Sequence, residues 1–220
     1  IVLCESIRQE KVPITDSNGK YLADLNIETL VPPIAPLALS ALALAPFPLP
    51  KVPVQLSQFW LFKAGAGNAP TLPVVAFFIY ASSHFGSFYH LFNQVHPNHE
   101  PPIPQQWNEI AAQRRVEETL IAFREIFQRE PSIAHEMLNS LDAKDKPLRS
   151  PLERRMLSSL IRMFQGKNSR HLDFYGPAGT IHTLMYHKVL NGQNRPDNVK
   201  GKATETSTVL EGKVVFVGLS

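Results

Sequence analysis

Histidines are the residues of this chain that point most directly to chemistry. Imidazole is the commonest transition-metal ligand in proteins, and it also acts as an acid or base near neutral pH. The chain has eight histidines. One group of them is concentrated in a short stretch: His84, His90, His96 and His99. If these side chains met in space, they would form one wall of a metal or haem site.

The spacing within this group argues against a shared site. On a helix, the step from His84 to His90 turns the second side chain about 240° away from the first. Pro97 lies between His96 and His99 and favours extended backbone there. We therefore expect ordinary loop or surface histidines. Metal or haem binding by this group is kept as the alternative hypothesis.

The catalytic motifs that we tested are incomplete. His135 begins a zinc-protease-like pattern, but Asn139 stands where that pattern needs its second histidine. Gly65 and Gly67 begin a dinucleotide-binding pattern, but Pro70 stands where its third glycine belongs. We predict no catalytic residue, and an enzyme is not the favoured class.

Basic side chains indicate a different chemistry, the binding of phosphates. They lie on or just after two predicted helices: Arg114, Arg115, Arg154, Arg155, Arg162, Lys167 and Arg170. If the two helices packed side by side, these side chains would form a stripe for an anion or a nucleic-acid backbone. Glutamates interleave with them, so two solvated helix faces are the simpler interpretation. Aromatic residues do not alternate with them, so sequence-specific reading of single strands is not expected.

Three predicted helices over residues 105–166 would hold these arginines. The first begins after Pro104 and ends before Pro131, because proline is tolerated only in the first turn of a helix. Its apolar residues recur every three or four positions. A short helix follows it. The third begins at a capping box formed by Ser150, Pro151 and Glu153, and it ends at Gly166. Its predicted buried face is Leu152, Met156, Leu157, Leu160, Ile161 and Phe164.

Two apolar stretches precede these helices. Residues 72–92 are predicted to form a buried helix or helix pair, because the uninterrupted apolar part, residues 74–81, is shorter than the roughly 20 residues of a membrane span. Residues 31–54 are apolar but too rich in proline for a long helix or a central strand. We predict an extended arm that packs on a neighbouring subunit. Its contact residues would be Pro46, Pro48, Pro50 and Pro53, in a pattern typical of polyproline II ligands. The alternative is a buried extended connection within one domain.

The two ends of the chain carry weaker signals. Residues 1–30 form either a hairpin around Asn18 and Gly19, since Asn-Gly favours tight turns, or a helix over residues 21–27. Near the other end we predict a helix over residues 180–190, a polar loop, and a hairpin over residues 206–218.

Composition limits the class of protein. An apolar fraction of 44% and a charged fraction of 19% in 220 residues predict a folded core. The net charge of +3 permits contact with nucleic acid without requiring it. The single cysteine, Cys4, excludes a disulfide within the chain. It favours a reducing compartment such as the cytoplasm, or a viral particle, over the secretory route.

These observations predict a mainly α fold. We expect a single helical domain of four to six helices, with a Pro-rich extended arm and a small C-terminal β-hairpin. Residues 1–54 would be the N-terminal segment and arm, 55–192 the helical core, and 193–220 the polar loop and hairpin. No motif is specific enough to name a family.

The favoured function is that of a structural or assembly protein, coat-like or a subunit of a complex. It would self-associate through the arm, with a mildly basic surface facing nucleic acid. We expect a homo-oligomer or larger assembly, with no cofactor and no membrane span. The alternative function is a helical enzyme or binding protein that holds a metal or haem with the histidine group.

Overall fold

The computed structural model describes four stretches of the chain, residues 1–48, 58–97, 103–142 and 150–171. The chain divides into two units, residues 1–172 and 173–220, and the described residues all belong to the first unit. The predicted C-terminal helix over residues 180–190 and the hairpin over residues 206–218 lie outside the described residues.

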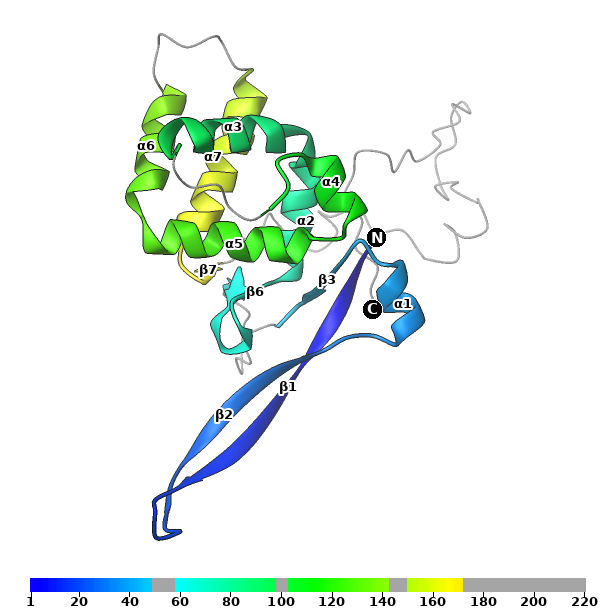
Figure 1. Ribbon diagram of the computed structural model, residues 1–220, viewed down its shortest axis with the longest axis vertical. Coiled ribbons are helices and arrows are strands. Elements are labelled where there is room, and N and C mark those ends of the chain that lie inside the picture. Colours follow the sequence, from blue (N-terminus) through cyan, green and yellow to red (C-terminus); the bar gives the residue numbers. More distant parts are fainter. Residues whose placement is uncertain (49–57, 98–102, 143–149, 172–220) are drawn as a thin grey trace, which may run out of the picture. The chain divides into compact units, whose positions relative to one another are not determined.

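The described residues contain seven strands and seven α-helices (Figure 1). The strands are β1 (Val2–Thr15), β2 (Tyr21–Val31), β3 (Ala43–Pro46), β4 (Gln58–Trp60), β5 (Phe62–Lys63), β6 (Ala69–Pro70) and β7 (Ser169–His171). The α-helices are α1 (Ala35–Ser40), α2 (Leu72–Tyr80), α3 (Phe85–Val95), α4 (Trp107–Ala112), α5 (Val116–Arg129), α6 (Ser132–Asp142) and α7 (Pro151–Gln165). Two 3-10 helices, η1 (Ala64–Ala66) and η2 (Ser82–His84), join neighbouring elements.

The prediction of a mainly α fold is wrong. Strands make up 26% of the described residues, and the N-terminal region forms a three-stranded sheet in the order β2-β1-β3. Of the two alternatives for residues 1–30, the hairpin is the one that forms. Its residues alternate between apolar and polar on either side of Asn18 and Gly19, and this period of two suits a strand rather than a helix.

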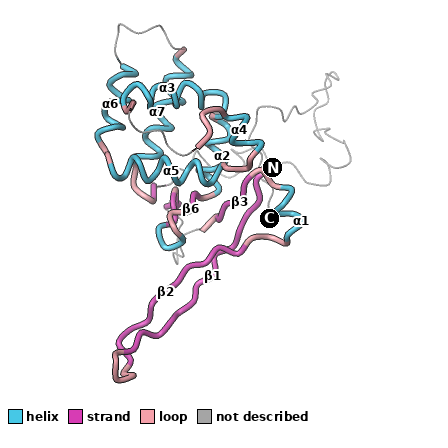
Figure 2. The backbone as a smooth tube through the Cα atoms, viewed as in Figure 1, coloured by secondary structure: helices cyan, strands magenta, loops and turns pink. Residues whose placement is uncertain are grey.

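The long hairpin of β1 and β2 is regular almost to its turn. The strands pair antiparallel from Ser6 opposite Val31 to Ile14 opposite Ala23. Figure 2 shows them as a continuous two-stranded ribbon. At the turn, one oxygen of Asp16 accepts from the backbone N–H groups of Asn18, at 2.9 Å, and Lys20, at 2.8 Å. Gly19 takes the positive φ of 78° that the turn requires.

The proline-rich segment, as far as it is described, lies along its own chain. Strand β3 pairs in parallel with the start of β1, from Val2 opposite Ala43 to Glu5 opposite Pro46. Ala43, Ala45 and Pro46 are buried. In β3 this arrangement corresponds to the alternative of a buried extended connection within one domain, whereas α1 has no buried residue and Ile34, Leu37 and Leu39 are 50–70% exposed. Among the predicted arm contacts, Pro46 lies in β3 and Pro48 is half-buried, whereas Pro50 and Pro53 lie outside the described residues.

The first long helix predicted here is split in two. Helices α4 and α5 are separated at Arg114, which takes a left-handed φ of 53°. The N–H of Arg115 donates to the carbonyl of Ile110 at 3.0 Å, and that of Arg114 to Ala111 at 3.2 Å. This pair of bonds is the Schellman helix end, which usually uses glycine at the left-handed position. Because an arginine stands at this position, the sequence did not indicate that a helix ends there.

The helices predicted over residues 72–92 and 150–166 are confirmed. Residues 72–92 form the pair α2 and α3, and the capped helix is α7, where the Ser150 hydroxyl accepts from the Glu153 N–H at 3.1 Å. Its face is buried as predicted at Leu157, Leu160, Ile161 and Phe164, and Met156 packs against the core. Leu152, however, is 60% exposed, so its assignment to the buried face is wrong.

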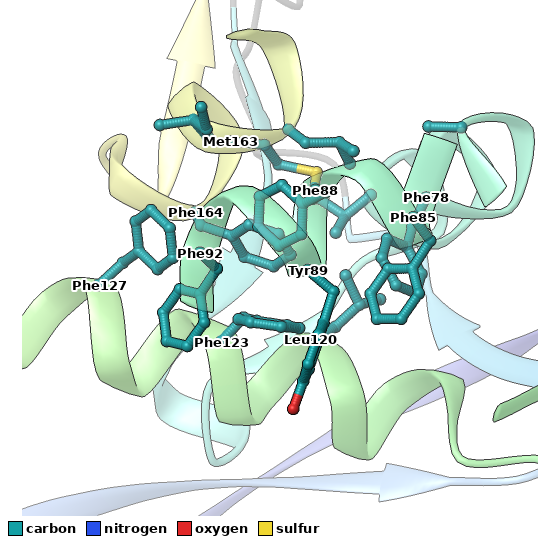
Figure 3. Close-up of a cluster of buried hydrophobic side chains, with 14 of the residues drawn as sticks. Phe78, Phe85, Phe88, Tyr89, Phe92, Leu120, Phe123, Phe127, Met163 and Phe164 are labelled. Carbon is teal, nitrogen blue, oxygen red and sulfur yellow. The ribbon is translucent and has the colours of Figure 1, made fainter. Parts of the chain in front are cut away.

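A cluster of phenylalanines forms the centre of the core (Figure 3). Its rings come from α2, α3, α5 and α7: Phe78, Phe85, Phe88, Phe92, Phe123, Phe127 and Phe164. Phe123 packs edge-on against Phe88, with ring centroids 5.1 Å apart, and lies 5.4 Å from Phe164. Aromatic pairs of this kind add about 0.5–1.5 kcal/mol each beyond the area they bury. The cluster therefore fixes how the four helices pack.

A buried arginine joins this core to the strands. Arg124 on α5 is only 2% exposed, and its guanidinium lies 4.9 Å from the centre of the Phe62 ring. It donates to the carbonyl of Phe164 and, at 2.8 Å, to the side-chain oxygen of Asn168. The Phe164 carbonyl belongs to the last turn of α7, where carbonyls lack helical partners and the helix dipole favours a cation. Burial lowers the pKa of Arg124, but an arginine stays protonated in proteins.

We expect Arg124→Met to lower the free energy of unfolding by about 2–3 kcal/mol, because the Phe164 carbonyl and the Asn168 amide would lose their buried donor. Chemical denaturation measures the loss. Arg129→Met, at an exposed position on the same helix, is the control and should change stability by less than about 0.5 kcal/mol. Equal losses for the two variants would contradict a structural role for the Arg124 contacts.

Candidate functional site

One face of the hairpin is apolar in its distal half. Even-numbered residues of β1 share a face with odd-numbered residues of β2, because Val12 lies opposite Leu25 and Ile14 opposite Ala23. We call this set the distal apolar face: Val12, Ile14, Ala23, Leu25 and Ile27. Its large members are between 39% and 49% exposed. A patch of aliphatic side chains on a two-stranded ribbon has no second layer of its own to cover it.

The opposite face of the same ribbon is mostly polar, although it includes Leu22, which is 59% exposed, and it turns toward its own chain near the root. Glu28 accepts from the Gln9 side chain at 2.9 Å and forms an ion pair with Lys63 at 2.9 Å. These contacts lower the pKa of Glu28, against the opposing effect of burial. Gly65 lies so close that a Cβ there would stand 2.3 Å from a Glu28 carboxylate oxygen. The hairpin is therefore held at its root by its polar face, and the described residues leave its distal apolar face uncovered.

Two charges flank the distal apolar face on the side nearer the root. Arg8 and Glu10 lie on the same face as Val12, two residues apart along β1. Their side chains are 65% and 57% exposed and approach to 3.9 Å. An exposed pair at this distance contributes little to stability. Both side chains therefore remain available for contact with another molecule.

A half-buried carboxylate of α5 lies beside the root of the hairpin. Glu117, in the first turn of α5, accepts a hydrogen bond from the N–H of Leu44 in β3. Burial raises the pKa of Glu117 above its ordinary value, although the bond from Leu44 opposes this. Burial and, second, the charge of Glu117 also raise the pKa of Glu5 in β1. Where the sheet meets α5, the carboxyl groups of Glu5 in β1 and Glu117 in α5 therefore both have raised pKa values.

A raised pKa in the folded state means that the folded protein holds this proton more tightly than the unfolded chain. The stability from Glu117 is therefore present in acid and is lost as the pH rises through its folded pKa. We expect Glu117→Gln, which keeps the oxygen that accepts from Leu44, to gain stability relative to the wild type between about pH 4 and about pH 7. Thermal unfolding across this range measures the difference.

Glu125→Gln, at an exposed position on the same helix, controls for the loss of one carboxylate. A stability difference between wild type and Glu117→Gln that stays constant with pH would contradict the raised pKa.

The predicted histidine group is not gathered into a site. His84 ends η2, and His90 is exposed on α3 with its Nε2 2.9 Å from the side-chain nitrogen of Gln94. His96 follows α3, with its Nε2 3.5 Å from a carboxylate oxygen of Glu130. His99 lies outside the described residues. In the described part of the chain, no three histidine, cysteine or acidic side chains are placed to hold one metal ion.

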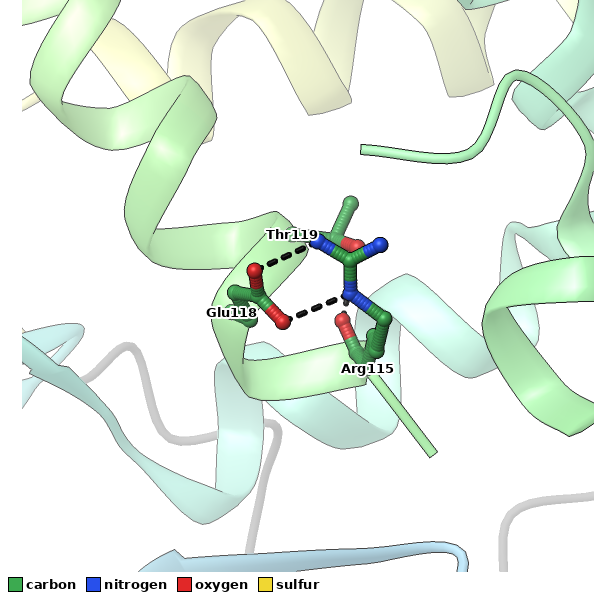
Figure 4. A network of polar contacts seen from close by, with 3 residues as sticks. All are labelled: Arg115, Glu118 and Thr119. Atoms are coloured by element: carbon green, nitrogen blue, oxygen red, sulfur yellow. Dashed lines mark hydrogen bonds and ion pairs between the residues drawn. The ribbon is translucent and has the colours of Figure 1, made fainter. Parts of the chain in front are cut away.

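The predicted basic stripe is spread over separate places. Arg114 donates to the Leu39 carbonyl. Arg115 pairs with both carboxylate oxygens of Glu118, at 2.6 and 2.5 Å, beside Thr119 (Figure 4). Both arginines lie at the start of α5.

The remaining basic residues follow α7 and the segment after it. Arg170 donates to the Arg162 carbonyl at 2.8 Å, at the end of α7 that meets α5, and Lys167 is exposed between them. Arg154 and Arg155 are exposed near the other end of α7, about 10–12 Å from Arg162 along the helix axis. The structure therefore brings Arg162 and Arg170 together, but separates them from Arg154 and Arg155.

A shallow apolar groove lies between β4, α2 and α7. It has a volume of about 250 Å³ and is lined by Phe59, Leu61, Pro73, Val74, Phe77, Ser159, Met163 and Arg170. Its polar members are Ser159 and Arg170, and Arg170 already binds the Arg162 carbonyl. It therefore lacks the several convergent polar groups that are typical of a ligand site.

Sequence reasoning missed the hairpin surface. The signal was present, because Val12 and Ile14 precede the Asn-Gly turn at a spacing of two, and Ala23, Leu25 and Ile27 follow it at the same spacing. This alternation identifies an amphipathic ribbon. It does not tell whether the apolar face is covered, which is the property that makes it a candidate site.

Comparison with known proteins gives no family for this chain: no protein-family model, no curated protein and no solved structure matches it. Among the described residues, no helix has the length and apolar character needed to cross a membrane.

Proposed function

We propose that this protein is a structural or assembly subunit whose N-terminal hairpin docks on a neighbouring subunit. One observation carries the proposal: Val12, Ile14, Leu25 and Ile27 are 39–49% exposed together on one face of a regular hairpin. Large contiguous apolar patches on soluble proteins mark interaction surfaces. Here the patch stands on a ribbon that contributes nothing further to its own core.

Energetics support the same proposal. Each of these side chains is already about half covered, so burying the remainder contributes about 1 kcal/mol per side chain. The distal part of the hairpin has only two strands, and a two-stranded ribbon is marginally stable in water without a further strand or layer packed on it. Docking on a neighbour supplies that layer. The surface is thus favourable to cover and costly to leave in water.

The hairpin replaces the proline-rich segment as the proposed contact. Residues 43–46 form β3, which pairs with β1 and is largely buried, so this part of the segment holds the hairpin root in place. The surface proposed to contact the neighbouring subunit is therefore the distal apolar face and not Pro46 and its neighbours. A coat-like role remains part of this proposal.

We expect Leu25→Asp to abolish self-association, because it places a charge at the centre of the distal apolar face. Light scattering over a dilution series to high protein concentration measures the native mass. Asn26→Asp is the matched control, since it adds the same carboxylate at the next position on the opposite, polar face. The control should keep the mass of the wild type.

Because Leu25 is half exposed in the single chain, its replacement should leave the fold intact, as circular dichroism can verify. A wild-type chain that stays monomeric throughout and binds no partner through this face would contradict the proposed function. So would an equal effect of Leu25→Asp and Asn26→Asp.

A further inference from the structure

We infer that the apolar groove between β4, α2 and α7 receives an amphipathic helix of a partner protein, which carries acidic side chains on either side of an apolar anchor residue. The residues that line this groove lie outside the hairpin, so this contact is separate from the proposed function and does not rest on it. The size of the hollow, the arginines beside it and their spacing along α7 carry the inference.

The hollow suits one anchor side chain better than a complete small ligand. Its volume of about 250 Å³ is below the roughly 300–1,000 Å³ of typical small-molecule pockets. Phe59, Pro73 and Phe77 are only half-buried there, and Val74 and Met163, which also line it, are buried. A large apolar side chain inserted among them would cover the surface that the half-buried residues still expose. Anchors of this kind contribute much of the binding energy at protein interfaces.

Helix α7 continues the apolar surface beyond the hollow. Ser159 and Met163 line the hollow, and Leu152 lies on the same face, because the eleven residues from Leu152 to Met163 make three turns of helix. The Leu152 side chain is 60% exposed. It therefore belongs to one apolar strip with the groove and is not an isolated exposed residue. The strip is about 16 Å long, which matches a partner helix of about three turns.

Arginines lie on this groove and beside it. Arg170 stands opposite Phe59 in the pairing of β7 with β4, and it donates to the Arg162 carbonyl at 2.8 Å, at the end of α7. Arg162 and Arg155 are exposed on α7, three residues after and four residues before Ser159, and such positions are neighbours on a helix surface. Within the described stretches, these three arginines form no ion pair, and no acidic residue lines the groove. Acidic side chains of a partner would supply the missing counter-charges.

The spacing of two of these arginines matches a helix. Arg155 and Arg162 are seven residues apart, about 10 Å along α7. Acidic residues seven positions apart on a partner helix lie on one face at the same separation, and the residue three or four positions from each shares that face. Such a helix would pair both carboxylates with these arginines and insert the middle side chain beside Ser159. In an extended strand the same 10 Å separates residues about three positions apart, whose side chains point to opposite faces.

Two fluorescently labelled helical peptides test the inference on the full chain. The first has one tryptophan between two glutamates that are seven residues apart on the same face, and the second has lysines in place of these glutamates. We expect the glutamate peptide to bind with a dissociation constant of about 10–100 µM, and the lysine peptide to bind about tenfold more weakly. The double variant Arg155→Glu, Arg162→Glu should reverse this preference. Fluorescence anisotropy at low salt measures each affinity.

A matched double variant separates the local contact from the net charge. The pair Arg129→Glu, Arg154→Glu changes the net charge equally, at exposed positions outside the groove lining. It should keep the preference for the glutamate peptide. Ser159→Trp, which fills the hollow from an exposed position, should weaken binding of the glutamate peptide about tenfold. Gln165→Trp, exposed about 120° around α7 from Ser159, should leave it unchanged. Circular dichroism verifies the fold of each variant.

Equal affinity for the two peptides overturns the inference, as do equal effects of the two double variants or an unchanged affinity in Ser159→Trp. So does the absence of binding of the glutamate peptide up to about 1 mM. Decanoate is measured in parallel. If it binds the wild type but not Ser159→Trp, while neither peptide binds, the occupant is a small amphiphilic anion and the partner helix is wrong. The Leu25→Asp variant should bind the glutamate peptide like the wild type, so failure of the hairpin contact and failure of the groove contact are distinguishable.

Discussion

The buried guanidinium of Arg124 is the contact on which the order of the strands around the helical core depends. It reaches from α5 to the last turn of α7 and to Asn168, the residue just before β7. The Asn168 carbonyl in turn accepts from the N–H of Leu61 at 2.7 Å, and β7 pairs with β4. One side chain thus joins two helices to the two-stranded sheet. The phenylalanine cluster fixes how the four helices pack, and the arginine adds directional hydrogen bonds that fix which polar groups meet.

The elements that the sequence could predict are those whose signals are local. The cap at Ser150, the stop at Gly166 and the apolar spacing of α7 all lie within a few residues of one another, and the structure confirms them. The parallel pairing of β3 with the start of β1 joins segments about 40 residues apart, so no local pattern announces it. The break at Arg114 was missed because its left-handed backbone is held by bonds to Ile110 and Ala111 and not by a glycine. Burial of Arg124 was missed because a charged side chain is usually solvated, even beside buried positions such as Phe123.

The candidate surface likewise combines a feature that local sequence predicts with one that depends on distant segments. Alternation in residues 12–27 is visible in the printed sequence, and the Asn-Gly turn sets the register. Whether an apolar face is covered depends on elements distant in the sequence, here β3, η1 and α5, which contact the root and not the distal half. For the histidines and arginines, closeness in the sequence suggested sites that the structure does not form. Residues that are chemically suggestive by type lay near one another in the chain, but helix geometry placed His84 apart from His90 and Arg154 apart from Arg162.

The clamp at the hairpin root implies a gradient of local stability along the ribbon. Near the root, β1 passes from its ladder with β2 to its ladder with β3, and the pair of Glu28 with Lys63 ties β2 to the segment at η1. Towards the turn, only the ladder between the two strands holds the backbone, so the free energy of local opening falls along the ribbon. Amide hydrogens there exchange through fraying of the ribbon and not through unfolding of the core. The outer part of the ribbon can therefore open and close many times during the life of one folded core.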